Sequence, residues 1–301
     1  MDKSTQRGSL EMVAAMLISG TIGWFVLVSG QAVPDVVFWR CAFGALTLLV
    51  ICALMGFLRP GLLTRHTFLL IMLSGVAIVA NWVLLFASFS RASIAISTAV
   101  YNVQPFILIG LTALFLGEKI TLPKLAWLAV SFVGMLAIVS AHTEQGESGS
   151  AYLQGIALAL GAALMYAVAA LIIKRLKGVP PHLIALIQVS TGVLLLAPLA
   201  DFSELPSGVQ AWGSLVTLGV VHTGVMYVLL YGAIQKLPTA LFGALTFIYP
   251  IAAIFVDWFA FGHRLEIQQW VGVAAILLAA AGIQLGWRFG WRRVTDPKIQ
   301  S

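Results

Sequence analysis

The feature that most constrains the fold is a segment that occurs twice, 145 positions apart and without a gap. Residues 81–105 align with residues 226–250. The same offset places Pro105 on Pro250 and Gly117 on Gly262, so the register holds over about two helices and their connection. Self-similarity at a fixed spacing indicates that the chain is built from two copies of one structural unit.

Composition requires that both copies lie in a lipid bilayer. The chain is 60% hydrophobic and 9% charged, with a mean hydropathy of +1.01, which excludes a water-soluble protein of this length. A helix needs about 20 apolar residues to cross the hydrocarbon core. We place ten such runs at residues 10–30, 34–57, 67–89, 93–116, 124–141, 152–174, 181–200, 211–235, 239–261 and 269–288. The sequence therefore predicts an all-α polytopic membrane protein.

Ten helices divide into two copies of five, and an odd number forces the second copy to enter the membrane upside down. The predicted fold is thus a pair of inverted five-helix repeats. We place repeat one at residues 9–141, a polar linker at 142–150, repeat two at 151–288 and a tail at 289–301. No hydrophilic segment is long enough for a soluble domain.

Lysine and arginine predict the orientation. If the N-terminus is cytoplasmic, 14 of the 17 basic residues lie in cytoplasmic segments, two lie outside, and Arg40 lies within the second helix. Because cytoplasmic loops are enriched in these residues, both termini are expected inside and the linker outside. The net charge of +6 then reflects topology and attraction to membrane lipid rather than binding to nucleic acid.

Several short motifs resemble the EamA-type signature of the drug/metabolite transporter superfamily. They are Phe38-Trp39-Arg40, Pro105, Leu116-Gly117-Glu118-Lys119 and Trp127, with a weaker second set at Pro250, Gly262-His263-Arg264 and Trp270. The second set departs from the pattern where His263 replaces the usual acid. The aromatic-rich interior is most similar to YddG-type bacterial exporters of aromatic and other amino acids. This resemblance implies alternating access in a bacterial inner membrane.

Polar and aromatic residues at membrane depth are the candidates for a substrate site, because such groups are costly in lipid unless they have a partner or line a wet cavity. An inverted-repeat transporter holds its substrate between the repeats, near the midplane. We expect substrate contacts from Trp24, Asn81, Trp82, Tyr101, Asn102, Gln104, Tyr166, His222, Tyr227, Phe247 and Tyr249. The alternative is that the aromatic residues only pack, and that His222 is a core histidine bonded to a nearby carbonyl.

Four further residues have predicted structural roles. Pro105 and Pro250 each remove a backbone donor within a helix, which predicts paired bending points or structural kinks. Arg40 and Asp257 are expected to act as structural or gating charges. The alternatives for Arg40 are snorkelling to the membrane surface, pairing with Asp35 or Asp257, and contact with a substrate carboxylate.

Other function classes have little support in the sequence. There is no phosphate-binding loop for ATP, no pair of carboxylates at mid-membrane, and no cluster of residues with metal-ligand spacing. We therefore expect no cofactor, no metal and no enzymatic activity. The leading hypothesis is a secondary or uniport exporter of amino acids. The alternatives are an exporter of purine-like or cationic compounds, an integral-membrane enzyme, and a passive pore or sensor.

Small residues bear on the oligomeric state. Gly282, Gly286 and Gly290 recur at four-residue spacing in the last helix, which allows close helix approach. This predicts tight packing within a monomer or in a weak homodimer.

The orientation can be tested by cysteine labelling. With Cys41 and Cys52 replaced by alanine, a cysteine at Gly146 should react with a membrane-impermeant thiol reagent in intact cells, and one at Ser301 should react only after lysis. Labelling of both positions in intact cells would contradict the topology and the inverted repeat together.

Overall fold

A computed structural model describes residues 3–59, 61–117, 121–140, 147–174, 176, 178–203 and 205–287, and this part contains helices and no strands. The predicted all-α architecture is confirmed. The helices are α1 (Lys3–Gly20), α2 (Ile22–Val28), α3 (Val33–Leu54), α4 (Arg65–Ala92), α5 (Ile94–Tyr101), α6 (Gln104–Leu116), α7 (Leu122–Ser140), α8 (Glu147–Lys174), α9 (Pro181–Leu196), α10 (Gly208–Gly219), the π-helix η1 (Val220–Val225), α11 (Met226–Lys236), α12 (Thr239–Thr246), α13 (Ile248–Phe261) and α14 (Ile267–Gln284).

The ten predicted apolar runs correspond to ten passages through the bundle, and four of these passages are interrupted. Six spans are long and apolar enough to cross a membrane alone, and four apolar helices are shorter. The interrupted passages are the first (α1 and α2), the fourth (α5 and α6), the eighth (α10, η1 and α11) and the ninth (α12 and α13). Four of the ten passages therefore contain a point at which the regular α-helix is interrupted.

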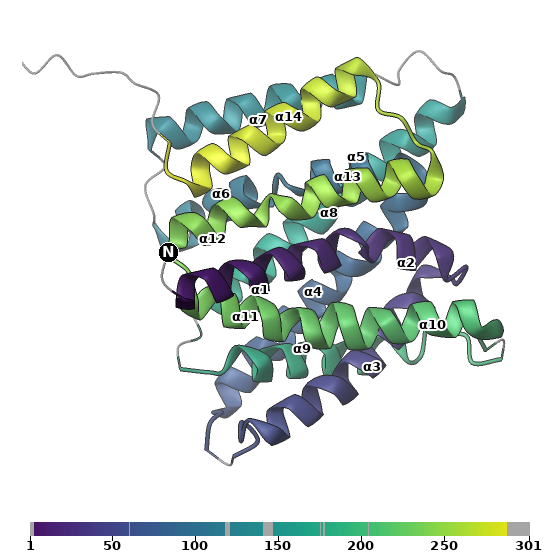
Figure 1. Cartoon of the computed structure of the whole chain (residues 1–301), viewed down its shortest axis with the longest axis vertical. Coiled ribbons are helices and arrows are strands. Elements are labelled where there is room, and N and C mark those ends of the chain that lie inside the picture. The colour runs from purple at the N-terminus through teal and green to yellow at the C-terminus, as the bar shows by residue number, and fades with distance from the viewer. Residues whose placement is uncertain are drawn as a thin grey trace, which may run out of the picture.

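The two repeats run in opposite directions. In Figure 1, α1 begins at the end of the bundle marked N, and α8, the first helix of repeat two, begins at the other end. The last helix, α14, returns to the end where α1 begins. We call this the N-terminal end and the other the far end; the charge distribution predicts that the N-terminal end is cytoplasmic.

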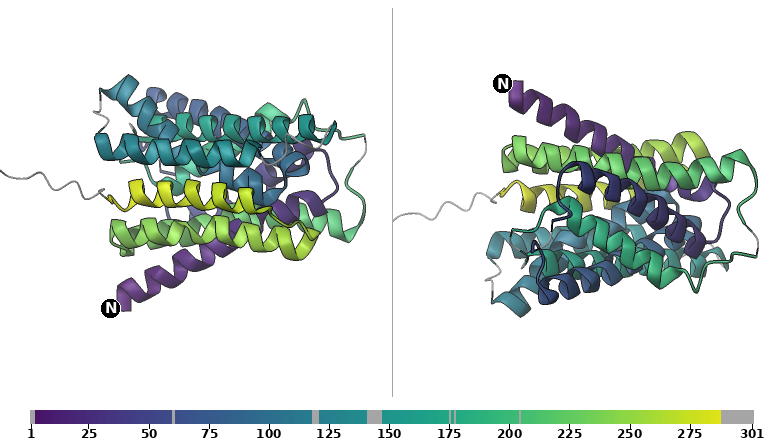
Figure 2. Two further views of the ribbon diagram at one scale, coloured as in Figure 1. Left: turned by 90° about the horizontal axis from the view of Figure 1, so that it is seen from above. Right: turned by 90° about the horizontal axis from the view of Figure 1, so that it is seen from below.

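Helices of one repeat pack against helices of the other in symmetry-related pairs. The third passage, α4, packs along α8, the sixth; correspondingly α11, in the eighth passage, packs along α1, in the first. The remaining pairs are α3 with α9 and α7 with α14. The view from above shows α14, in yellow, beside α7, in teal (Figure 2, left). Each of these four interfaces joins the two repeats.

Glycine allows some of these helices to approach closely. A β-carbon on Gly44 in α3 would lie 2.8 Å from the methyl carbon of Thr223, and one on Gly219 would lie 2.9 Å from the backbone nitrogen of Gly44. Both distances are too short for a side chain, so α3 is held tightly against the π-helix region. Gly282 of α14 faces the ring of Trp127 in α7 in the same way, within one chain.

The buried apolar residues form two clusters. The larger one extends through α3, α4, α5, α8 and α9, and the smaller one is centred on Met12, Met16 and Met226, between α1 and α11. Residues of both clusters line a central cavity, among them Trp82 of the larger cluster and Met16 of the smaller one.

Candidate functional site

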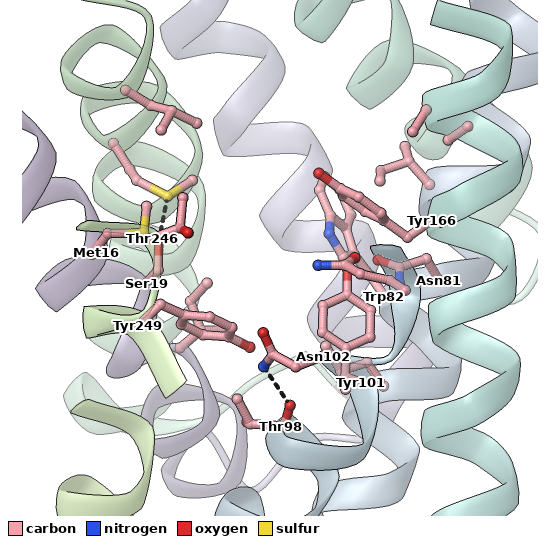
Figure 3. A pocket seen from close by; sticks show the side chains of 18 of the residues that line it. Met16, Ser19, Asn81, Trp82, Thr98, Tyr101, Asn102, Tyr166, Thr246 and Tyr249 are labelled. Carbon is pink, nitrogen blue, oxygen red and sulfur yellow. Dashed lines mark hydrogen bonds between the residues drawn. The ribbon is translucent and has the colours of Figure 1, made fainter. Parts of the chain in front are cut away.

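A cavity of about 720 Å³ lies in the middle of the bundle. One wall carries Asn81, Trp82, Tyr101 and Tyr166 from α4, α5 and α8. The facing wall carries residues from α1, α12 and α13, among them Tyr249, as Figure 3 shows. Ligand pockets typically measure about 300–1,000 Å³, so this space is large enough for a small organic solute.

Most residues that the sequence predicted for a substrate site do line this cavity. They are Asn81, Trp82, Tyr101, Asn102, Gln104, Tyr166, Tyr227, Phe247 and Tyr249. Tyr101 and Tyr166 contact each other edge to face, with ring centroids 6.0 Å apart. That these residues contact substrate stays a prediction; the structure brings them together around one space.

His222, which the sequence predicted for the substrate site, lies outside the lining of this cavity. It is buried. Its Nδ1 lies 3.1 Å from the carbonyl oxygen of Thr217, five residues earlier, and its Nε2 lies 2.9 Å from the Thr21 hydroxyl. Because both ring nitrogens have protein partners, His222 links the π-helix to the break between α1 and α2, as the alternative of a bonded core histidine describes.

Trp24 is a second predicted residue that lies outside the lining of the cavity. Its side chain is 37% exposed and packs edge to face on Phe25. Trp24 lies in the short helix α2, beyond the break at Thr21. The first passage is interrupted at this point, whereas the sixth passage, α8, which carries Tyr166, is continuous.

The two proline positions correspond to interruptions rather than simple kinks. The helix α5 ends at Tyr101 and α6 begins at Gln104, immediately before Pro105. In repeat two, α12 ends at Thr246 and α13 begins at Ile248, before Pro250. Tyr101 and Thr246 are equivalent under the 145-residue offset, so the two copies break at the same place.

Arg40 is a buried cation that lines the cavity. Its Nε donates a 3.1 Å hydrogen bond to Thr223 Oγ1, and its guanidinium carbon lies 4.1 Å from the centroid of the Trp82 ring. The predicted pairing with Asp35 or Asp257 is wrong. Asp35 accepts the backbone N–H of Asp201, and in the described part of the chain no carboxylate forms an ion pair with Arg40.

Asp257 instead joins the two repeats at the far end. Its carboxylate is buried, and Oδ2 accepts a 3.0 Å hydrogen bond from the backbone N–H of Ala95 in the first turn of α5. Its Oδ1 lies 2.9 Å from Nδ1 of His263. A carboxylate is stabilised at a helix N-terminus, where the backbone N–H groups are unpaired. Asp257 thus fastens α13 of repeat two to α5 of repeat one.

The cavity is closed at the far end and extends to the N-terminal end. Its far-end lining residues Phe89 and Ile94 are 3% and 1% exposed. At the other end the lining continues through Ile173, Lys174 and Ile234, close to the ends of α8 and α11. The structure therefore represents a state open toward the end that carries the N-terminus.

Sequence reasoning missed some lining residues. Gln188 of α9 lines the cavity and donates through Nε2 to Ser74 of α4 at 3.1 Å. This contact, from passage seven to passage three, is the repeat-related counterpart of the contact from Arg40 in passage two to Thr223 in passage eight. Gln188 is polar and lies in the middle of a predicted helix. The rule that selected the other polar residues at membrane depth therefore also applies to Gln188.

Removal of the Asp257 carboxylate should loosen the far end. A hydrogen bond to a charged group contributes about 1.5–3 kcal/mol, so Asp257→Ala should raise the open fraction of the far end by about 10- to 100-fold. The measurement is the rate at which a cysteine at the buried Ala99 reacts with an impermeant thiol reagent added from the far side. His263→Ala is the matched control, because it keeps the bond to Ala95, and it should have the smaller effect. Equal labelling rates in Asp257→Ala and wild type would rule out this fastening role.

Comparison with known proteins identifies relatives over the whole chain. The uncharacterized transporter YxxF of Bacillus subtilis is 29% identical over 97% of this chain and 94% of its own length. An uncharacterized transporter of Archaeoglobus fulgidus is 27% identical over 93% of this chain and 96% of its own length. A solved protein, titled only as a crystal structure of a protein, matches with a TM-score of 0.63 at 18% identity over 92% of this chain and 96% of that one. This last likeness concerns the fold alone.

A family comparison gives the assignment. The EamA-like transporter family matches residues 6–140 and again residues 153–285, once in each half of the chain. The duplicated membrane-transporter fold of that family agrees with the two helical repeats described above. The chain therefore belongs to the EamA-like transporter family.

Proposed function

We propose that the protein exports amino acids, with aromatic amino acids among them, across the bacterial inner membrane by alternating access. The observation that carries this proposal is the central cavity with aromatic side chains from both repeats. Repeat one contributes Trp82 and Tyr101. Repeat two contributes Tyr166 from α8, Tyr227 from α11 and Tyr249 from α13. Tyrosine and tryptophan combine a flat apolar surface with one polar group, which suits an amphipathic solute.

The charge of the cavity favours amino acids over cationic drugs. Among the described lining residues the charged ones are Arg40 and Lys174, both basic, and none is acidic. A cationic compound would gain no ion pair there and would be repelled by Arg40 in a low-dielectric setting. A zwitterion carries a carboxylate that this cavity accommodates.

The orientation of the cavity supports export. The cavity extends to the N-terminal end, which the basic residues predict to be cytoplasmic. A carrier open on that side accepts substrate from the cytoplasm and releases it outside after the far end opens. Such a carrier works as a uniporter or secondary transporter, as a monomer or weak homodimer.

Substitution of the cavity aromatics tests this function. Substitution of Trp82, Tyr101 or Tyr166 by alanine should lower the counterflow of radiolabelled L-phenylalanine in proteoliposomes by about two- to tenfold. Each substitution removes an aromatic contact worth about 0.5–1.5 kcal/mol. Expression and elution in size-exclusion chromatography should stay close to wild type.

The control is Trp24→Ala, which removes an aromatic residue outside the cavity and should leave counterflow unchanged. Wild-type flux should also saturate and show trans-stimulation, as expected of a carrier and not of a pore. Wild-type counterflow in all three cavity variants would show that the aromatic site is not used.

A further inference from the structure

We infer that Arg40 is the binding site for the substrate α-carboxylate and that Asn81 accepts the α-ammonium group, so that the cavity recognises the two ends of a zwitterion separately. This inference rests on the proposed function and specifies the ligand chemistry of its site. The cavity then distinguishes an amino acid from an amine and from a simple carboxylic acid of the same size.

The first argument is the incomplete pairing of Arg40. A guanidinium has five N–H groups, and in the described part of the chain only the Nε group of Arg40 has a hydrogen-bond acceptor, the Thr223 hydroxyl. Arg40 is nevertheless 2% exposed. A buried charge without a counter-ion is costly at membrane depth, and a carboxylate in the cavity would supply both the missing charge and paired acceptors.

The second argument is how rigidly Arg40 is held. Its guanidinium lies over the Trp82 ring at 4.1 Å and near the Phe86 ring at 5.5 Å. Thr223, which accepts from Nε, donates in turn to the carbonyl oxygen of Leu218, five residues earlier, near the end of α10. The two aromatic rings pack on the guanidinium group of Arg40, and Thr223 accepts the hydrogen bond from its Nε. The terminal N–H groups are therefore fixed in place before any substrate binds, which suits bidentate recognition of a carboxylate.

The third argument is an acceptor with no donor. Asn81 is 1% exposed and lines the cavity. Its Nδ2 donates to the carbonyl oxygen of Ala162 at 2.7 Å, and this bond fixes the amide so that Oδ1 is the remaining polar atom. That Oδ1 is buried and accepts no hydrogen bond among the described residues, although the Tyr101 side chain lies beside the Asn81 amide. A second cavity residue, Gln104, has a buried Oε1 in the same situation.

These groups lie on one side of the cavity. Asn81 and Trp82 are consecutive residues of α4, and Arg40 lies over the Trp82 ring. Figure 3 shows Asn81, Trp82, Tyr101 and Tyr166 on one wall and Tyr249 across the cavity from them. A zwitterion held by its two charged ends at this wall directs its side chain toward the aromatic residues. Cation and acceptor thus select the backbone of the amino acid, while the rings select its side chain.

The test is a panel of three ligands of one shape, measured by competition with radiolabelled L-phenylalanine on the purified protein. The ligands are L-phenylalanine, phenethylamine, which lacks the carboxylate, and 3-phenylpropionate, which lacks the amine. Wild type should bind L-phenylalanine at least about tenfold more tightly than either analogue, since each analogue leaves one buried polar group unpaired.

Two variants assign the two ends. Arg40→Gln should weaken the binding of L-phenylalanine and 3-phenylpropionate at least about tenfold. It should not weaken the binding of phenethylamine, because that cation loses a repulsion from Arg40 and no attractive contact. Asn81→Ala should show the opposite pattern, with 3-phenylpropionate unchanged. Because each prediction is a difference between ligands on one protein, a general loss of packing does not imitate it. Arg91→Gln, at an exposed arginine of the far end, is the matched control and should leave all three affinities unchanged.

The outcomes separate this inference from the proposed function. If wild type binds and transports L-phenylalanine but binds phenethylamine equally well, or if Arg40→Gln keeps the wild-type preference, the inference is overturned and the exporter stands. If wild type neither binds nor transports any amino acid, the proposed function fails. Should Arg40→Gln not fold, the wild-type panel alone still decides, because equal affinity for L-phenylalanine and phenethylamine contradicts a carboxylate site.

Discussion

The need to satisfy backbone hydrogen bonds in the absence of water is the constraint on which the rest of this structure depends. Within a bilayer, an interrupted helix is tolerated only where protein covers it or where it lines a cavity. Here the interruptions of the fourth and ninth passages meet at the central cavity, with Tyr101, Asn102, Thr246 and Phe247 among its lining residues. The π-helix in the eighth passage is covered differently, because Thr223 and His222 contact the carbonyl groups five residues earlier. The breaks therefore determine where polar groups are available at mid-membrane.

The two repeats share a fold but differ in detail, and the difference accounts for the state observed. At the far end Asp257 bonds the N-terminus of α5. Its counterpart under the 145-residue offset is Thr112, whose hydroxyl donates to the carbonyl oxygen of Ile109 in its own helix. At the far end, a charged hydrogen bond to Asp257 therefore joins the two repeats. At the N-terminal end, the equivalent residue is a threonine that bonds within α6. The passages differ likewise: α4 and α8 are continuous, whereas their counterparts in the eighth and first passages are interrupted.

Much of this could be predicted from the sequence, because hydropathy and a gapless repeat depend on local pattern. The ten passages, the inverted order and most lining residues follow from apolar run length, the odd number of helices per copy, and aromatic residues near mid-membrane. The hydrogen-bond partners of His222 and Arg40 could not be predicted in this way. Whether His222 faces a cavity depends on a π-helix that rotates it toward Thr217 and Thr21. Whether Arg40 pairs with Asp257 depends on the tertiary partners of each, which are Thr223 for Arg40 and Ala95 and His263 for Asp257. Trp24 was misplaced for a related reason, since a break at Thr21 changes the direction of everything after it.

The central claim is that the cavity is closed at the far end and open at the N-terminal end. Substrate binding then closes the N-terminal end and opens the far end. Electron-spin distance measurements in proteoliposomes test it directly, with spin-label pairs at exposed positions of a variant lacking Cys41 and Cys52. One pair, Leu114 and Gln235, spans the N-terminal end, and the other, Arg91 and Phe259, spans the far end. On addition of L-phenylalanine the first distance should shorten and the second should lengthen within the same sample. If both distances stay unchanged, or both change in the same sense, the account of a cavity with alternating ends is contradicted.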